Sequence, residues 1–163
     1  MKEALCIFYP DDPNNKLGIK GYVSLTQQTP NSPTRITFKF ENLPPRTSRG
    51  IHIHEKGIKS GQNCMDAGGH FNPYNKVHGC IFINEQNRHA GDLINNIISD
   101  KDGNFEYTYV DNLISLYEPN SVIGKTIVIH EKPDDLGLGG TEESLKTGSA
   151  GGRMACSVIV EEI

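Results

Sequence analysis

The stretch Gly50-Ile51-His52-Ile53-His54-Glu55 alternates apolar and polar residues with a period of two. That alternation predicts an extended strand, because successive side chains of a strand point to opposite faces. His52 and His54 would then share one face, and Ile51 and Ile53 would share the other. Two imidazoles held side by side on a strand are a ready pair of metal ligands. The strand therefore predicts a metal site on a β-sheet.

Short alternating runs of the same kind recur along the 163-residue chain. Polar turns rich in Gly and Pro separate them, and no stretch has the pattern of a convincing amphipathic helix. Besides the strand of His52, strands are predicted at residues 3–9, 18–26, 35–41, 105–109, 122–130 and 153–161. The chain length and this spacing favour one all-β domain over residues 1–163, an antiparallel sandwich or barrel.

The formal net charge of −4 argues against nucleic acid and anionic membranes as partners, because both attract basic patches. No apolar run approaches the roughly 20 residues that span a bilayer. Residues 1–6 lack the apolar segment of a signal peptide. We therefore expect a cytoplasmic protein, with no membrane partner.

Four cysteines are present, and none forms a Cys-x-x-Cys pair. A zinc ribbon is therefore not expected, and in the cytosol the default is four free thiols. Four cysteines allow three complete pairings, and their spacing selects none of them. The cysteines are Cys6, Cys64, Cys80 and Cys156.

Two long segments, Glu55–Asp92 and Glu131–Gly152, break the strand pattern. Long loops in compact domains are often functional, and the first one carries three histidines and an aspartate. Three imidazoles and one carboxylate are a complete tetrahedral set, which is typical of structural zinc. The set is His70, His78, His89 and Asp92. The strand histidines His52 and His54, with His130 on a later strand, form an all-imidazole cluster that suits copper.

Five motifs then carry a resemblance that runs from the first strand to the last. Together they resemble the copper/zinc superoxide dismutase family of the intracellular type, which implies a Greek-key β-barrel of about eight strands with two long functional loops. The motifs are Gly50–Glu55, Gly69-His70-Phe71-Asn72-Pro73, Arg88-His89-Ala90-Gly91-Asp92-Leu93, Ile129-His130-Glu131-Lys132-Pro133-Asp134-Asp135-Leu136-Gly137 and Gly152-Arg153-Met154-Ala155-Cys156.

The resemblance implies a role for each histidine. Copper would be bound by His52, His54, His70 and His130, and zinc by His70, His78, His89 and Asp92, so that His70 bridges the two metals. Asp134 would link a copper histidine to a zinc histidine. Cys64 and Cys156 would form a disulfide, and Cys6 would be a buried free thiol.

The implied activity is the disproportionation of superoxide to dioxygen and hydrogen peroxide by Cu(II)/Cu(I) cycling, an antioxidant defence. His70 and Arg153 would be the catalytic residues, the first as proton carrier and the second as anion holder. Electrostatic guidance of the substrate would come from Glu142, Glu143, Lys146 and Thr147. The partners implied are a second copy in a homodimer, for which Ile7, Ile123, Gly124 and Ile159 are candidate contacts, and a copper chaperone is a further candidate.

Three alternatives compete with this interpretation. A non-catalytic carrier or sensor of copper or zinc with the same fold would be expected to lack a copper histidine or Arg153, and this chain keeps them. A cupin-type oxygenase would also place His-x-His on a strand, but would leave His78, His89 and Asp92 unexplained. A β-sandwich adhesion domain would need six incidental histidines.

The chain departs from the family at Cys80-Ile81-Phe82-Ile83, at Ile94-Asn95-Asn96 and at Ser157.

Overall fold

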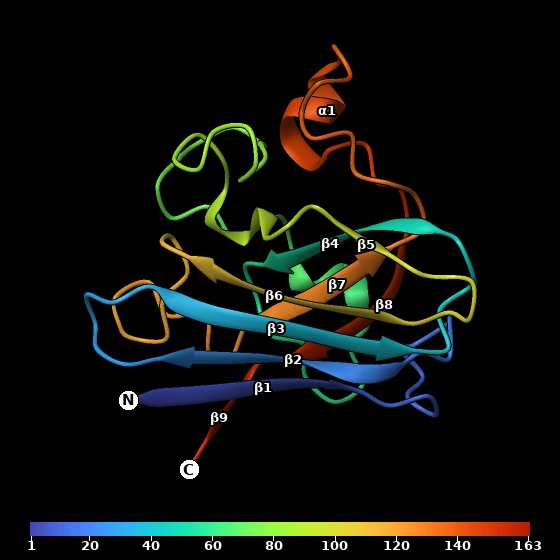
Figure 1. Ribbon diagram of the computed structural model, residues 1–163, viewed down its shortest axis with the longest axis horizontal. Helices are drawn as coiled ribbons and strands as arrows, with labels where there is room; N and C mark the ends of the chain where they lie inside the picture. Colours follow the sequence, from blue (N-terminus) through green and yellow to red (C-terminus); the bar gives the residue numbers. More distant parts are fainter.

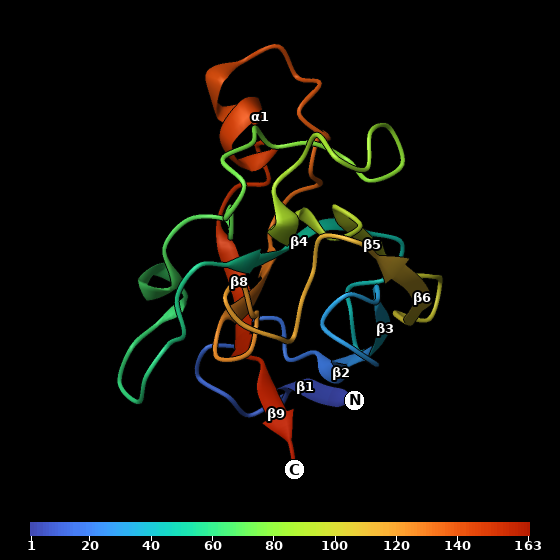
Figure 2. The ribbon, with the colours of Figure 1, turned by 90° about the vertical axis from the view of Figure 1, so that its left-hand side faces the viewer.

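Two antiparallel sheets face each other across the core (Figures 1 and 2). The computed structural model describes residues 1–163. The first sheet has the order β6-β3-β2-β1-β9, formed by β1 (Lys2–Phe8), β2 (Lys20–Gln27), β3 (Thr34–Glu41), β6 (Phe105–Asp111) and β9 (Val160–Glu162). The second has the order β5-β4-β7-β8, formed by β4 (Ser48–His54), β5 (Asn96–Ile98), β7 (Thr126–His130) and β8 (Arg153–Val158). The predicted all-β sandwich is confirmed.

Strand alternation builds the core. In β3, Ile36, Phe38 and Phe40 are buried on one face, whereas Arg35, Lys39 and Glu41 on the other face are exposed. Burying one such side chain contributes roughly 1.5–3 kcal/mol. In β4 the isoleucines of the His-x-His stretch join the core cluster of 24 residues, which leaves the histidines to the opposite face, as predicted.

The pairing is that of a Greek key rather than of a simple meander, because β3 pairs with β6 and not with β4, and β4 pairs with β7 as well as with β5. Nine strands are present, compared with about eight expected. The additional β5 has three residues, which is too short for an alternating pattern to predict.

Two predicted strands have different bounds in the structure. The run 122–130 is a strand only from Thr126, because Gly124 turns the chain with a φ of 84°. The run 153–161 breaks at Ile159, which is buried and donates its N–H to Lys125 O at 2.8 Å. The chain there passes from β8, which pairs with β7, to β9, which pairs with β1 in the other sheet.

The later part of the first long loop and the second long loop meet at one end of the molecule, above the four-stranded sheet in both ribbon views (Figures 1 and 2). The second loop contains a six-residue helix, α1 (Glu142–Thr147), where only a charged loop was expected. Thr141 caps its N-terminus and Gly148 ends it with a φ of 70°. The N–H of His78 donates to Leu145 O at 2.9 Å and so ties the two loops together. The structure contains no helix long and apolar enough to cross a membrane.

Candidate metal centre

Backbone pairing at the end of β4 brings the first histidines together. His70 forms an isolated antiparallel bridge with His54, supported by Glu55 N–H to Gly69 O at 2.9 Å and Phe71 N–H to Ile53 O at 2.8 Å. His130 ends the neighbouring β7. The His70 ring consequently lies against that of His52, with ring centroids 4.1 Å apart.

Four buried histidines form the first cluster, and their potential ligand nitrogens all lie within 4.8 Å of one another. The outer nitrogens of three of them are occupied: His54 Nδ1 donates to Gly68 O at 2.8 Å, His130 Nδ1 to Gly151 O at 3.1 Å, and His52 Nε2 to Asp134 Oδ2 at 2.5 Å. The inner nitrogen of each neutral ring therefore carries a lone pair.

These inner nitrogens lack protein partners of their own. His52 Nδ1 and His70 Nε2 are buried with no hydrogen bond, and His54 Nε2 lies 3.4 Å from His130 Nε2, lone pair against lone pair. Buried polar atoms in native proteins are nearly always paired. Four converging imidazole lone pairs without protons between them fit a copper ion.

The second cluster surrounds one carboxylate oxygen. Asp92 Oδ1 lies 3.1 Å from His70 Nδ1, 2.8 Å from His78 Nδ1 and 3.0 Å from His89 Nδ1. The Nδ1 atoms of His70 and His89 are 3.2 Å apart. Four ligands at zinc's usual bond lengths would stand about 3.3 Å from one another in a tetrahedron, so this set fits zinc.

The ring of His78 makes a cation necessary at the second cluster. Its Nε2 lies 2.8 Å from Asp134 Oδ1, so the Nε2 proton is directed there. In the neutral ring, Nδ1 would then direct a lone pair at the oxygen of Asp92, which is repulsive unless a cation lies between them. Burial would lower the pKa of His78, but hydrogen bonds with Asp134 and Asp92 raise it to about 9. Without zinc, a proton supplies the positive charge.

Asp134 joins the two clusters, since its two oxygens take the Nε2 protons of His52 and His78. Gly148, which ends α1, lies against this contact. A Cβ on Gly148 would stand 2.3 Å from Asp134 Oδ1 and 2.5 Å from His78 Nε2, so only glycine fits beside the link.

Arg153 lies at the edge of the four-histidine cluster. Its guanidinium donates to Cys64 O at 2.8 Å and to Gly68 O at 2.6 Å. Gly68 O also accepts from His54, so one carbonyl fixes both the ring and the guanidinium. Burial lowers the pKa of Arg153, but an arginine remains charged at neutral pH. The group can therefore hold an anion beside the cluster.

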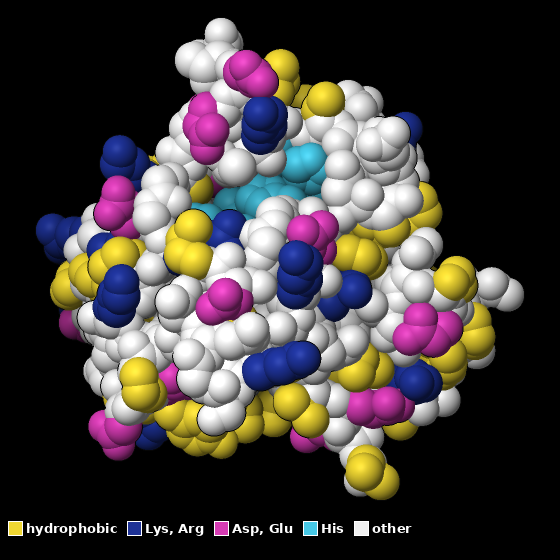
Figure 3. Space-filling model, turned by 180° about the vertical axis from the view of Figure 1, so that it is seen from behind, with side chains coloured by type: hydrophobic (Ala, Val, Ile, Leu, Met, Phe, Trp, Pro, Cys, Tyr) yellow, Lys and Arg dark blue, Asp and Glu magenta, His cyan; other side chains and the backbone are white.

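The four residues predicted to guide the substrate all belong to α1. Glu142, Glu143 and Lys146 are exposed and Thr147 is half-buried. Lys146 pairs with Glu142 at 3.0 Å, and Thr147 donates to Glu143 Oε1 at 2.7 Å. Figure 3 shows histidine side chains at the bottom of a hollow, with basic and acidic side chains around its rim.

Cys64 and Cys156 form a disulfide, with a sequence separation of 92 residues. It ties the first long loop to β8, close to the Arg153 contact with Cys64 O. Cys6 and Cys80 are free and buried. Burial raises the pKa of the Cys6 thiol to about 12, so that thiol is unreactive.

The metal-free protein is expected to lose stability on acidification. Burial lowers the pKa of His52, His54 and His70, and lowers that of His130 to about 4. The unfolded chain protonates these histidines near their ordinary pKa of about 6.5 and so binds more protons below that pH. Their contribution is complete above about pH 6.5 and is lost as pH falls toward 4.

His78 acts in the opposite sense, because its pKa is raised to about 9: its contribution is complete below about pH 6.5 and is lost as pH rises toward 9. Between about pH 7 and pH 5, the stability lost through the four histidines with lowered pKa exceeds the stability gained through His78. Urea unfolding of chelator-treated protein should give a smaller free energy at about pH 5 than at about pH 7. A free energy that stays level or grows on acidification would contradict the burial of the four rings in the metal-free state.

Backbone groups that orient the histidine rings could not be found from the sequence. The carbonyls of Gly68 and Gly151 fix two rings of the four-histidine cluster, and no side-chain pattern reveals a carbonyl. Asn95 and Asn96 stood out in the sequence only as departures from the family, yet both contact Asp134. Asn95 donates to Asp134 Oδ2 at 3.3 Å, and Asn96 contacts the backbone of Asp134.

Comparison with known proteins gives one consistent result. The sequence model of the family described as copper/zinc superoxide dismutase matches residues 19–159. A Cu-Zn superoxide dismutase of Podospora anserina is 50% identical over 141 residues, which are 86% of this chain and 89% of that protein. One of Candida glabrata is 47% identical over 87% of this chain and 90% of its own length. One of Pleurocordyceps sinensis is 45% identical over 98% of this chain and 97% of its own length.

The match thus extends over nearly the whole chain and includes both clusters, the Asp134 link and Arg153. On the strength of these matches and of the fold, the chain belongs to the copper/zinc superoxide dismutase family.

Proposed function

We propose that this chain disproportionates superoxide at the four-histidine cluster, with copper held there and zinc held at the second cluster. The observation that carries the proposal is the position of His70. One of its ring nitrogens faces His52, His54 and His130, and the other faces His78, His89 and Asp92. A ring shared in this way would hold one metal at each nitrogen, with both ring protons removed.

Copper bound at this cluster would supply one-electron chemistry, alternating between Cu(II) and Cu(I), so that 2 O2⁻ and 2 H⁺ become O2 and H2O2. His52, His54 and His130 would keep a fixed position, because a carboxylate or a carbonyl holds the outer nitrogen of each ring. Asp134 would keep the two clusters in register through its bonds to His52 and His78.

His70 would carry a proton for the reaction. Its Nε2 is buried and has no protein partner, so a proton placed there is directed toward the four-histidine cluster and the substrate. Its Nδ1 stays among Asp92 and His89, which holds the ring in place while Nε2 changes state. The second proton of the reaction comes from solvent.

A metal titration tests the shared position of His70. Copper added to metal-free protein should give a visible spectrum that shifts when one equivalent of zinc follows, because the zinc takes the other nitrogen of the bridging ring. Identical copper spectra with and without zinc would contradict the bridge.

Arg153 would hold the superoxide anion beside the cluster, and its replacement is expected to slow the reaction. Arg153→Ala should lower the second-order rate constant by about tenfold or more at low ionic strength, because the focusing of an anion by local positive charge is worth roughly 10- to 1000-fold. Arg153→Lys should recover part of the rate. Stopped-flow superoxide decay at low and high salt measures this, with metal content checked in parallel. Equal rates for the alanine variant and the native protein at low salt would exclude the steering role.

The α1 residues Glu142, Glu143, Lys146 and Thr147 would shape the field at the mouth of the hollow. The net charge of the chain is −4, so attraction of an anion must come from local positive charge. Lys146 would add to the positive charge of Arg153, although its ion pair with Glu142 offsets part of that charge.

A second copy of this chain would pack on the outer face of β1, β8 and β9. That face carries a groove of about 360 Å³ lined by apolar side chains from all three strands, including Leu5, Ile7 and Val158. Tyr9 is 59% exposed and Val160 is 60% exposed there. Ile159, one of the contacts suggested by the sequence, lies wholly in the core and is not available.

The homodimer is testable by mass. Val160→Lys should shift the mass in sedimentation equilibrium from about twice the 18.0 kDa of one chain to that of one chain. A matched change on an exposed strand residue elsewhere, Val110→Lys, should leave the dimer intact. A native chain that sediments as a monomer at micromolar concentration would contradict the proposed interface.

The cytoplasm is the proposed location, and a copper chaperone the proposed source of the metal. The supporting features are the intracellular type of the motifs and the burial of the four-histidine cluster, in which each histidine is at most 8% exposed.

A non-catalytic carrier of the same fold is the other candidate function. The complete ligand set together with Arg153 favours the enzyme.

A further inference from the structure

The link between the two clusters depends on how Asp134 itself is held. Its side chain is fully buried and its two oxygens accept four hydrogen bonds. The donors are His52 Nε2 at 2.5 Å, His78 Nε2 at 2.8 Å, Leu136 N at 2.7 Å and Asn95 Nδ2 at 3.3 Å. These four hydrogen bonds keep their geometry only while the backbone of Asp134 stays in place. The orientation of the two histidine rings therefore depends on that backbone.

The backbone of Asp134 is held by one side chain. Asn96 Nδ2 donates to Asp134 O at 3.0 Å, and Asp134 N–H donates to Asn96 Oδ1 at 2.7 Å. The amide thus makes the two hydrogen bonds that a residue of a neighbouring strand would make. The structure records no other partner for this N–H or this C=O.

The neighbouring strands fix Asn96 in turn. Asn96 begins the edge strand β5, where it pairs with Gly50 of β4. Gly50 N–H donates to Lys132 O at 2.9 Å, and a Cβ built on Gly50 would lie 3.6 Å from the Cβ of Asp134. The segment 132–134 is therefore held by Gly50 on one side and by Asn96 on the other.

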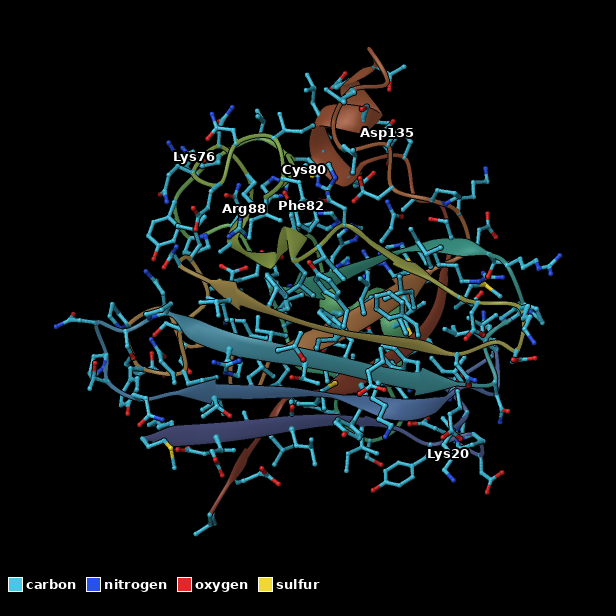
Figure 4. All side chains as sticks on the ribbon, in the orientation of Figure 1. Lys20, Lys76, Cys80, Phe82, Arg88 and Asp135 are labelled. Atoms are coloured by element: carbon cyan, nitrogen blue, oxygen red, sulfur yellow. A yellow bond between two sulfur atoms is a disulfide. The ribbon has the colours of Figure 1, made fainter.

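Asn96 stands between the metal centre and the surface. It is half-buried and lines a groove of about 390 Å³ together with Cys80, Phe82 and Leu136. Figure 4 labels Cys80 and Phe82 on the first long loop, and labels Asp135, the residue after Asp134, on the segment leading to α1. The remaining hydrogen-bonding capacity of the amide can be met by solvent from this groove, so a polar side chain is tolerated there.

We propose that Asn96 is a positioning residue of the metal centre: its side-chain amide fixes the backbone of Asp134 and so fixes the carboxylate that joins His52 to His78. The inference rests on the metal centre proposed above and adds a residue to it. Asn96 acts through Asp134 and touches neither metal nor substrate. Without it, the Asp134 backbone loses both partners, and the rings of His52 and His78 lose their fixed orientation.

Two variants separate the two hydrogen bonds. Asn96→Leu keeps the branched heavy-atom skeleton of the side chain but makes neither bond, whereas Asn96→Asp can still accept from Asp134 N–H but cannot donate to Asp134 O. Residues that orient metal ligands typically change metal affinity about 10- to 100-fold. Asn96 acts on the histidines only through Asp134, so we expect an effect at the lower end of this range. Asn96→Leu should release zinc to a chelator about tenfold faster than the native chain, and Asn96→Asp at a rate between the two. The copper electron paramagnetic resonance spectrum should change with both.

A matched control comes from Gln27, a buried amide that also holds backbone groups. Its Nε2 donates to Ser32 O at 2.7 Å and its Oε1 accepts from Leu116 N at 2.7 Å, and neither partner is part of the metal centre. Gln27→Leu should lower the melting temperature while leaving zinc release and the copper spectrum unchanged. This separates a loss of general stability from a loss of orientation at the metals.

The decisive result is the comparison of zinc release. Native release rates in both Asn96 variants would overturn the role of Asn96, even if the melting temperature fell as it does for Gln27→Leu. If the leucine variant does not fold, the aspartate variant decides by the same criterion. A native chain that binds no zinc at all would instead overturn the metal centre on which the inference rests.

Discussion

Replacing His70 with alanine is expected to lower the rate of superoxide disproportionation by about 100-fold or more. The residue has two tasks, as the ring shared by the two clusters and as the proton carrier, and loss of a general acid typically costs 10²–10⁴-fold. The first cluster would keep three imidazoles, and the second would keep His78, His89 and Asp92. Both metals should therefore still bind, although more weakly.

The spectra and the rates of this variant should change together. Zinc should no longer shift the copper spectrum, because no ring joins the sites, and stopped-flow superoxide decay should show the loss of rate. A variant that had only lost general stability would not lose both the zinc-induced spectral shift and the rate. A variant with normal zinc retention, a normal spectral shift and native turnover would refute the bridging assignment.

Asp134→Asn is expected to weaken zinc binding by about 10- to 100-fold with almost no change in shape. The carboxylate takes an N–H from His52 and another from His78. An amide offers one oxygen and one NH2 group, so it can accept from only one of the two rings. The other ring must change tautomer, which places a proton on the nitrogen that faces its metal.

The neighbouring aspartate provides the control for this change. Asp135 Oδ1 accepts from Ser144 Oγ at 2.7 Å and from Gly137 N at 3.0 Å, within the loop of α1 and away from the histidines. Asp135→Asn should therefore leave the zinc affinity within a few-fold of native. Calorimetric zinc titration compares the two, and equal affinities for Asp134→Asn and the native chain would exclude the link.

The part of the fold that follows strand alternation could be predicted from the sequence. The two faces of β4 are an example: the period of two separates Ile51 and Ile53 from His52 and His54, and burial in the structure agrees. Elements below the length at which a pattern forms could not be predicted. β5 has three residues and α1 has six, and both are stabilised by tertiary contacts and caps rather than by periodicity.

The same division applies to the metal centre. The chemistry of imidazole and carboxylate predicted two ligand sets. The resemblance to a family was needed to predict the pairing of Cys64 with Cys156 and the role of Asp134 as a link between two histidines. The spacing of four cysteines allows three pairings. The break of the last strand at Ile159 depends on which sheet each half joins, and that is decided by contacts with β7 and β1, far away in sequence.

The most direct test of the central claim is the rate of superoxide decay with metal-free protein reloaded first with zinc alone and then with copper and zinc. We predict no catalysis with zinc alone, and fast catalysis with both metals that slows as the salt concentration rises, because Arg153 attracts the anion electrostatically. Binding of both metals without catalysis would contradict the assignment of the four-histidine cluster as a dismutase centre and would favour the carrier of the same fold.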